Sequence, residues 1–168
     1  MRRAPVVVAL VLLALAGSGG TAWASTETLA VTVDDGGLLI SVDQTPYALP
    51  DARFAGTWYA TAGTLPALTV VDTRAGDPGW TVSGQISSFT NSTGAVLGNP
   101  MSWTPLVVDH SPVQVLTTGR AIIGLDGSRL LAAADPDAGR GTARLTADFR
   151  LLLPSPGTYT ATLTLTVI

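Results

Sequence analysis

Apolar and polar residues alternate with a period of two over most of this chain, and this pattern limits the fold more than any other feature of the sequence. It is clearest in the last 27 or so residues, where two segments each carry one apolar face: Ala143, Leu145, Ala147, Phe149 and Leu151, then Tyr159, Ala161, Leu163, Leu165 and Val167. A period of two places successive side chains on opposite faces of a β-strand. No window of helical length carries an apolar stripe. The sequence therefore predicts an all-β protein, and its many short strands predict a two-sheet antiparallel β-sandwich of the immunoglobulin-like type.

Turn-forming residues divide the strands into three predicted hairpins. Their arms are residues 27–33 and 38–43, residues 65–73 and 80–89, and residues 142–152 and 158–168. Each pair flanks a stretch rich in Gly, Asp or Pro, which is typical of a hairpin connection. Between the second and third hairpins, Pro100, Pro105 and Pro112 interrupt the pattern. Because proline cannot donate a backbone hydrogen bond, this segment is not expected to form a continuous central strand.

The N-terminus has the composition of a secretory signal peptide. Arg2 and Arg3 precede an apolar run at residues 4–16, and the small-residue stretch GSGGTAWA follows, with Ala22 and Ala24 at the positions that a signal peptidase reads. The apolar run is shorter than the roughly 20 residues that span a bilayer. We therefore expect a signal peptide at residues 1–24 and a single exported domain at 25–168 with no membrane span. Cysteine is absent, so the core of this domain must rely on packing alone.

Charge and residue types argue against several function classes. The chain has 12 acidic and 9 basic residues, an unfavourable balance for binding nucleic acid. It has one histidine, His110, and no thiol, so a Cys–His pair or a histidine-rich metal cluster is impossible. Asp109 and Ser111 flank His110, but neighbours on an extended chain point in different directions and do not form a triad. Asp135, Asp137 and Gly139 weakly resemble a calcium loop, which Pro136 interrupts. We expect no catalytic residue, cofactor or metal.

The tryptophans are the candidate binding residues, and each also has a packing interpretation. Trp80 shares a strand face with Val82 and Ile86, which favours a place in the core over a ligand platform. Tyr159 shares its face with apolar residues, and the same interpretation is favoured. Trp103 lies in the proline-rich segment, where an aromatic residue can be displayed to stack on a sugar ring, so buried and exposed positions both stay open.

Two further pairs of residues have structural interpretations. Trp58 and Tyr59 are adjacent, so at most one of them faces inward, and we expect it to be Trp58. Asp72 and Arg74 precede a tight turn, where the carboxylate is expected to bond backbone amides and the arginine to pair with an acid such as Asp77.

Three stretches of sequence occur in an order that resembles a known family. They are LTVVDTRAGDPGWTVSGQISSFTN around Trp80, WTP from Trp103, and the terminal GTYTATLTLTV. The chain resembles the WxL-domain surface proteins, whose motifs are W-x-L and Y-x-x-x-L-T-W-x-L. Trp80 and Val82 match the first motif, with Val for Leu. Tyr159, Leu163 and Thr164 match the second; Leu165 stands where the family has its second Trp, and Val167 where it has the last Leu.

The resemblance implies a non-catalytic protein of the Gram-positive cell surface that attaches non-covalently to peptidoglycan. The expected partners are peptidoglycan or another cell-wall glycan, or a WxL-interacting surface protein. The expected binding residues are Trp80, Val82, Trp103, Tyr159 and Leu163. An alternative is an immunoglobulin-like adhesion or interaction subunit that meets another protein through an edge strand and has no glycan affinity. A secreted glycosidase is disfavoured, because it needs a pair of carboxylates about 5 to 9.5 Å apart and no acid-rich aromatic cleft is visible.

Overall fold

The computed structural model describes residues 7–10, 27–30, 36–43, 46–91, 94, 96–97 and 100–168. The chain divides into two compact units, residues 1–35 and 36–168. In the first unit, β1 (Val7–Leu10) pairs antiparallel with β2 (Glu27–Ala30), Val7 opposite Ala30. Of the predicted signal peptide, only Val7–Leu10 belongs to the described residues, and residues 31–35 of the first predicted hairpin also lie outside them.

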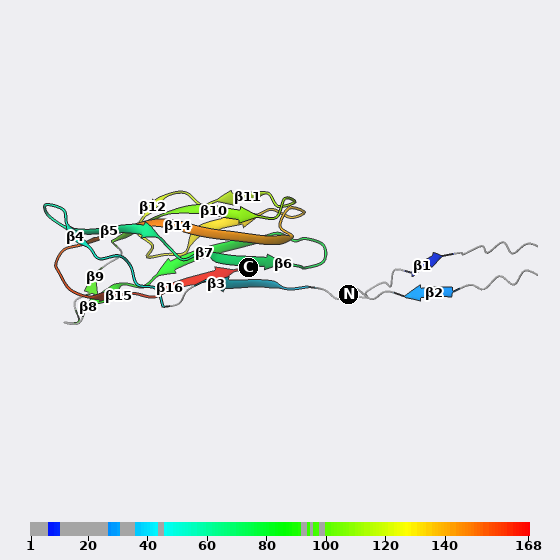
Figure 1. The fold of residues 1–168 in the computed structure, drawn as a ribbon, viewed down its shortest axis with the longest axis horizontal. Coiled ribbons are helices and arrows are strands. Elements are labelled where there is room, and N and C mark those ends of the chain that lie inside the picture. Colours follow the sequence, from blue (N-terminus) through cyan, green and yellow to red (C-terminus); the bar gives the residue numbers. More distant parts are fainter. Residues whose placement is uncertain are drawn as a thin grey trace, which may run out of the picture. The chain divides into compact units, whose positions relative to one another are not determined.

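The second unit consists of strands alone, and no helix occurs in the described part of the chain (Figure 1). The larger sheet contains β3 (Leu38–Val42), β4 (Arg53–Phe54), β5 (Tyr59–Thr64), β6 (Leu68–Asp72), β10 (Met101–His110), β12 (Ile122–Ile123) and β14 (Gly141–Leu153). The smaller sheet has the order β11 (Leu116–Thr118), β13 (Arg129–Ala134), β7 (Trp80–Ile86) and β16 (Leu163–Val167). A third sheet joins β15 (Tyr159–Thr160), β8 (Phe89–Asn91) and β9 (Val96–Leu97).

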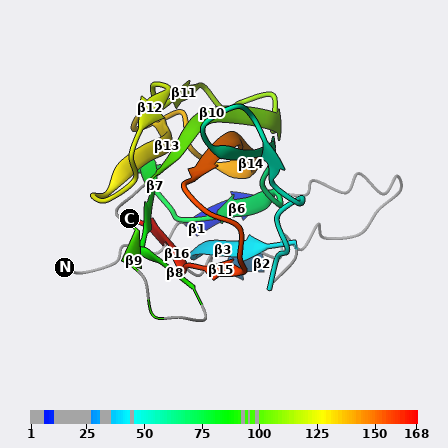
Figure 2. The same ribbon diagram turned by 90° about the vertical axis from the view of Figure 1, so that its left-hand side faces the viewer.

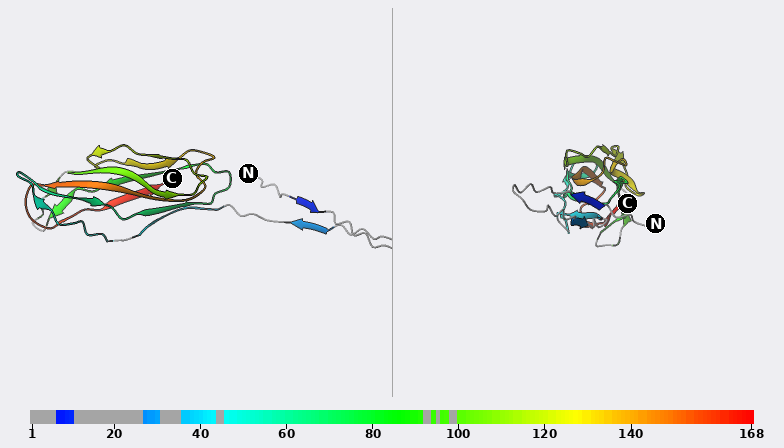
Figure 3. Two further views of the ribbon diagram at one scale, coloured as in Figure 1. Left: turned by 45° about the horizontal axis from the view of Figure 1, so that its top comes forward. Right: turned by 90° about the vertical axis from the view of Figure 1, so that its right-hand side faces the viewer.

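The long strand β14 organises the larger sheet. It pairs with β10 along one edge, and along the other edge with β6 near its start and β5 near its end, as its course along the molecule in Figure 3 shows. Viewed end-on in Figure 2, the strands of the two main sheets surround a common core. This core includes Val70, Trp80, Val82, Trp103, Leu145 and Phe149. The prediction of an all-β, antiparallel, two-sheet sandwich is confirmed.

The predicted faces of the C-terminal strands are correct, but their predicted pairing is wrong. Ala143, Leu145 and Ala147 are buried, and the odd-numbered residues of β16 are half-buried against the core. However, β14 belongs to the larger sheet and β16 pairs with β7 in the smaller one. The PSPG stretch therefore lies on a connection between layers. The apolar faces of both strands pack into the common core, that of β14 fully buried and that of β16 partly buried.

The other two predicted hairpins are also wrong, because their arms pair with other strands and not with each other. β3 pairs with β6, whereas β2 pairs with β1. The arms of the second predicted hairpin separate, because β6 lies in the larger sheet and β7 in the smaller one. The connection at residues 73–79 crosses from one sheet to the other. Its positive-φ residues Gly76, Asp77 and Gly79 shape this crossing rather than a two-stranded turn.

The part of the proline-rich segment from Met101 to His110 forms strand β10, contrary to the prediction, with a register shift between Val107 and Asp109. β10 runs through Pro105, which lies opposite Ala147. The carbonyl oxygen of Ala147 accepts a hydrogen bond from the Leu65 amide at 2.9 Å, so its peptide groups point away from β10. Pro105 consequently turns its nitrogen away from β14, toward the side where β12 pairs only with Ser102 and Trp103. A proline is tolerated at a position whose amide needs no partner in the sheet.

Candidate functional site

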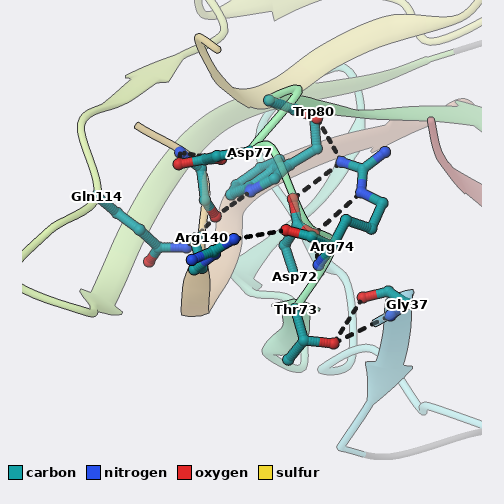
Figure 4. A network of polar contacts seen from close by, with 10 residues as sticks. Gly37, Asp72, Thr73, Arg74, Asp77, Trp80, Gln114 and Arg140 are labelled. Carbon is teal, nitrogen blue, oxygen red and sulfur yellow. Dashed lines mark hydrogen bonds and ion pairs between the residues drawn. The ribbon is translucent and has the colours of Figure 1, made fainter. Parts of the chain in front are cut away.

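A partly buried ion pair lies where the chain begins to cross between the sheets, near the start of β14 (Figure 4). Asp72 has no exposed surface and accepts hydrogen bonds from the Arg74 backbone N and Nε, both at 3.0 Å, and from Arg74 Nη2 at 2.9 Å. Arg74 Nη2 also donates to the Gly79 carbonyl. The hydrogen bonds from Arg74 lower the pKa of Asp72, outweighing the opposing effect of its burial. The Asp72 carboxylate thus bonds a backbone amide and Arg74 pairs with an acid, as predicted, and the acid of this ion pair is Asp72.

Trp80 belongs to a polar network that joins β7 to the loop before β14 (Figure 4). Its Nε1 donates to the Gly139 carbonyl at 2.9 Å, and Gln114 Nε2 donates to the same oxygen at 2.8 Å. The Asp77 carboxylate accepts from the Gly139 amide, with its oxygens at 3.0 and 3.2 Å. Trp80 is only 3% exposed. The packing interpretation of Trp80 is confirmed, and its side-chain N–H group is hydrogen-bonded within the protein.

The five predicted binding residues separate into two groups. Trp103, Tyr159 and Leu163 line one cavity between the sheets, to which Trp80 and Val82 do not contribute. Val82 is completely buried in β7. Tyr159 and Leu163 are half-buried, and the Tyr159 hydroxyl lies 2.8 Å from Ser155 Oγ. The strands that carry the two motifs of the resemblance are nevertheless neighbours, because β16 pairs with β7 and Val167 lies opposite Val82.

Trp103 is a core residue. It is 2% exposed and lies in β10, so the alternative of an aromatic residue displayed in an irregular loop is wrong. Its six-membered ring packs on Gly84 of β7, where a Cβ atom would come within 2.6 Å of Cη2. Trp103 Nε1 is buried without a hydrogen-bond partner among the described residues.

Exposed aromatic residues gather instead on the hairpin of β4 and β5, near the end of β14. Phe54 is 64% exposed and Trp58 is 47% exposed. Phe54 lies opposite Tyr59, with ring centroids 5.3 Å apart. The prediction that Trp58 faces inward is wrong, since Tyr59 is the more buried of the two. Sequence reasoning missed this hairpin, although Gly56, which adopts a φ of 86°, sits between the aromatic residues as a turn signal.

The residues weighed for catalysis and metal binding make local structural contacts. His110 Nδ1 lies 3.0 Å from the Ser111 carbonyl oxygen, while Ser111 Oγ accepts from the Thr142 amide at 2.9 Å. Asp135 and Asp137 are exposed. Within the described ranges, no three His, Cys, Asp or Glu side chains are grouped to hold a metal ion. The same ranges contain no helix long and apolar enough to cross a membrane.

Comparison with known proteins finds two similar chains among solved structures. No family model matches the chain, and no curated protein matches it. A chain from a solved chaperone–tip adhesin complex of CFA/I fimbriae is similar, with 14% identity and a TM-score of 0.47. The likeness covers 84% of this chain and 45% of that one, so this chain spans less than half of the adhesin-complex chain. At this level it identifies neither a family nor a function.

Proposed function

We propose that this protein is an exported, non-catalytic, WxL-like surface protein that associates non-covalently with the cell wall. The exposed aromatic hairpin carries the proposal. Phe54 and Trp58 both present large apolar surfaces to solvent from one short hairpin, and exposed apolar surface of this kind marks interaction sites. Flat aromatic faces suit the apolar faces of sugar rings, and the neighbouring Arg53 is exposed and able to donate to glycan hydroxyls.

The test is retention of the protein on purified cell walls and on peptidoglycan stripped of protein. Replacing Phe54 and Trp58 together by serine is expected to reduce retention on stripped peptidoglycan roughly tenfold. Two aromatic contacts worth about 0.5 to 1.5 kcal/mol each give a loss of this order. Ile123→Ser is the matched control, because Ile123 is 92% exposed on β12 and its loss removes apolar surface elsewhere. Equal retention of the double variant and the unchanged protein would refute the assignment of the hairpin, and release of reducing sugar would refute a non-catalytic role.

The free edge of β16 favours a second candidate, an interaction subunit that binds another protein. Ile168 exchanges backbone hydrogen bonds with Thr81 at 2.9 and 3.0 Å, so the even-numbered residues of β16 turn their peptide groups toward β7. Leu163, Leu165 and Val167 therefore turn theirs to the outer edge, where no described residue pairs with them. Such an edge can accept an added strand. Retention on protein-bearing walls only, with none on stripped peptidoglycan, would favour this candidate.

A further inference from the structure

Two exposed arginines of the larger sheet have no acidic partner among the described residues. They are Arg53 of β4 and Arg150 of β14. By contrast, the three ion pairs of the described part of the chain hold Arg74, Arg129 and Arg144, each against an aspartate. The chain has 12 acidic and 9 basic residues, so carboxylates are not scarce. Two neighbouring arginines without one are available to a ligand.

The register of β4, β5 and β14 brings these two arginines to one place. Arg53 lies opposite Ala60 of β5, and Arg150 lies opposite Ala62 of the same strand. Opposite residues of an antiparallel pair share a face, and so do residues two apart along a strand. Arg53 and Arg150 therefore flank β5 on one face, about 10 Å apart across the strands, with the small side chains of Ala60 and Ala62 between them. This is the outer face, because the odd-numbered residues of β14 are the buried ones.

Trp58 lies on the same outer face as the two arginines. The Ala55 amide donates to the Trp58 carbonyl at 2.7 Å, so the pairing of β4 with β5 continues into the turn. Alternation along β5 then places Trp58 on the face of Ala60, which is also the face of Arg53. Trp58 is 47% exposed. This end of the sheet thus combines an exposed aromatic ring with two cationic side chains.

The carboxylates near this site do not neutralise it. Asp148 shares the outer face two residues before Arg150, and it accepts a hydrogen bond from Thr64 Oγ1 at 2.6 Å. Asp51 is close to Arg53 in sequence but lines the cavity between the sheets, to which Arg53 does not contribute. Two arginines against one aspartate leave this part of the outer face positive, whereas the whole chain has a net charge of −3.

We propose that Trp58, Arg53 and Arg150 bind an acidic glycan, a polysaccharide that carries phosphate or carboxylate groups. Guanidinium groups bind the oxygens of both anions with paired hydrogen bonds, and an aromatic ring packs on the apolar face of a sugar. The negative charge of the whole protein disfavours a dense polyanion such as nucleic acid. The inference rests on the proposed function, because it specifies the wall component that the hairpin region recognises.

The experiment measures binding of the full chain, purified after export, by calorimetry. The probes are a glycosylated poly(glycerol phosphate), polygalacturonate and uncharged dextran. At least one acidic glycan is expected to bind about tenfold more tightly than dextran, and the preferred one identifies the anion as phosphate or carboxylate. Added NaCl is expected to weaken this binding and to leave that of dextran unchanged. Binding of neither acidic glycan more tightly than dextran would overturn the proposal, as would equal affinity for a single-stranded oligothymidylate.

Paired variants assign the binding to the two arginines. Arg53→Gln combined with Arg150→Gln removes both charges and is expected to weaken binding of the acidic glycan about tenfold, with no effect on dextran. Arg129→Gln is the matched control, since Arg129 is an exposed arginine of β13 in the smaller sheet. Unchanged binding by the double variant, or an equal loss in Arg129→Gln, would overturn the proposal.

Failure of this inference is distinguishable from failure of the proposed function. If wall binding through the hairpin is wrong, the serine variant of Phe54 and Trp58 keeps its retention on stripped peptidoglycan. If the acidic glycan is wrong, the glutamine variant of Arg53 and Arg150 keeps the affinity of the unchanged protein for the soluble probes. All four side chains are exposed, so both variants are expected to unfold at the temperature of the unchanged protein.

Discussion

Adding a single methyl group at Gly84 tests whether the packing of Trp103 is as tight as the structure indicates. Gly84 is buried in β7, opposite Leu165 of β16. The Cβ atom of Gly84→Ala would lie 2.6 Å from Trp103 Cη2, 3.0 Å from Cζ3 and 3.3 Å from Leu165 Cδ2. Carbon atoms pack best at about 3.5 to 4.0 Å, so the ring must move by roughly 1 Å. A rigid ring in a packed core resists such a shift, and overpacking of this kind costs about 1 to 3 kcal/mol.

The assay is urea unfolding, followed by fluorescence and circular dichroism. We expect Gly84→Ala to lower the free energy of unfolding by about 2 kcal/mol, the middle of that range, because the neighbouring cavity gives the ring some room. Gly127→Ala is the matched control, since a Cβ atom there has nothing within 4 Å, and its effect is expected to stay within about 0.5 kcal/mol.

A double-mutant cycle identifies the clash as the cause. Trp103→Phe removes the ring atoms Cη2 and Cζ3, so Gly84→Ala is expected to cost much less in that background than in the unchanged protein. Additive effects of the two substitutions would refute the reasoning. A cost below 0.5 kcal/mol for Gly84→Ala alone would refute it as well, because the ring would then be loosely held.

Two further predictions concern the polar network at the start of β14. Asp72→Asn is expected to destabilise the protein by about 3 kcal/mol at neutral pH, because it removes the negative charge that pairs with the partly buried Arg74. The pKa of Asp72 is lowered in the folded protein, so its contribution to the free energy of unfolding is complete above its ordinary pKa of about 3.9 and is lost as pH falls toward the folded value. Urea unfolding at several pH values should therefore show the stabilities of Asp72→Asn and the unchanged protein converging in acid. A stability difference that stays constant with pH would contradict this. Trp80→Phe is expected to lower the free energy of unfolding more than Trp103→Phe does, because only Trp80→Phe removes a hydrogen bond, the one to the Gly139 carbonyl. Equal losses in the same urea assay would argue against the hydrogen bond between Trp80 and Gly139.

The sequence predicted which side chains face inward, because that information is local. A period of two assigns alternate residues to one face whatever the partner strand is, and the inward face of β14 is correct from Ala143 to Leu151. Strand pairing is not local. The stretches DPG and PSPG were interpreted as hairpin turns, but the same residues equally suit a connection that crosses from one sheet to the other. Local turn chemistry does not distinguish the two outcomes.

Pro105 and Trp58 were misjudged for different physical reasons. Proline disfavours a central strand only where its nitrogen faces a partner, and the direction of that nitrogen depends on a register that the sequence does not show. For Trp58 and Tyr59, the prediction that only one of the two faces inward was correct, but the inward residue is Tyr59 and not Trp58. The hairpin of β4 and β5 lies near the end of the sandwich, where a large aromatic side chain has no opposing sheet to cover it.

Leu165 connects the sequence resemblance with the inter-sheet cavity. Alternation alone places Leu165 on the inward face of β16, and it is half-buried against the core, as a packing residue should be. Yet it also lines the inter-sheet cavity and lies beside Trp103. Side chains that border unfilled space forgo dispersion contacts, so Leu165 packs on one side only. The motif that this stretch resembles has a tryptophan at the position of Leu165, and a side chain of that volume would fill part of the cavity.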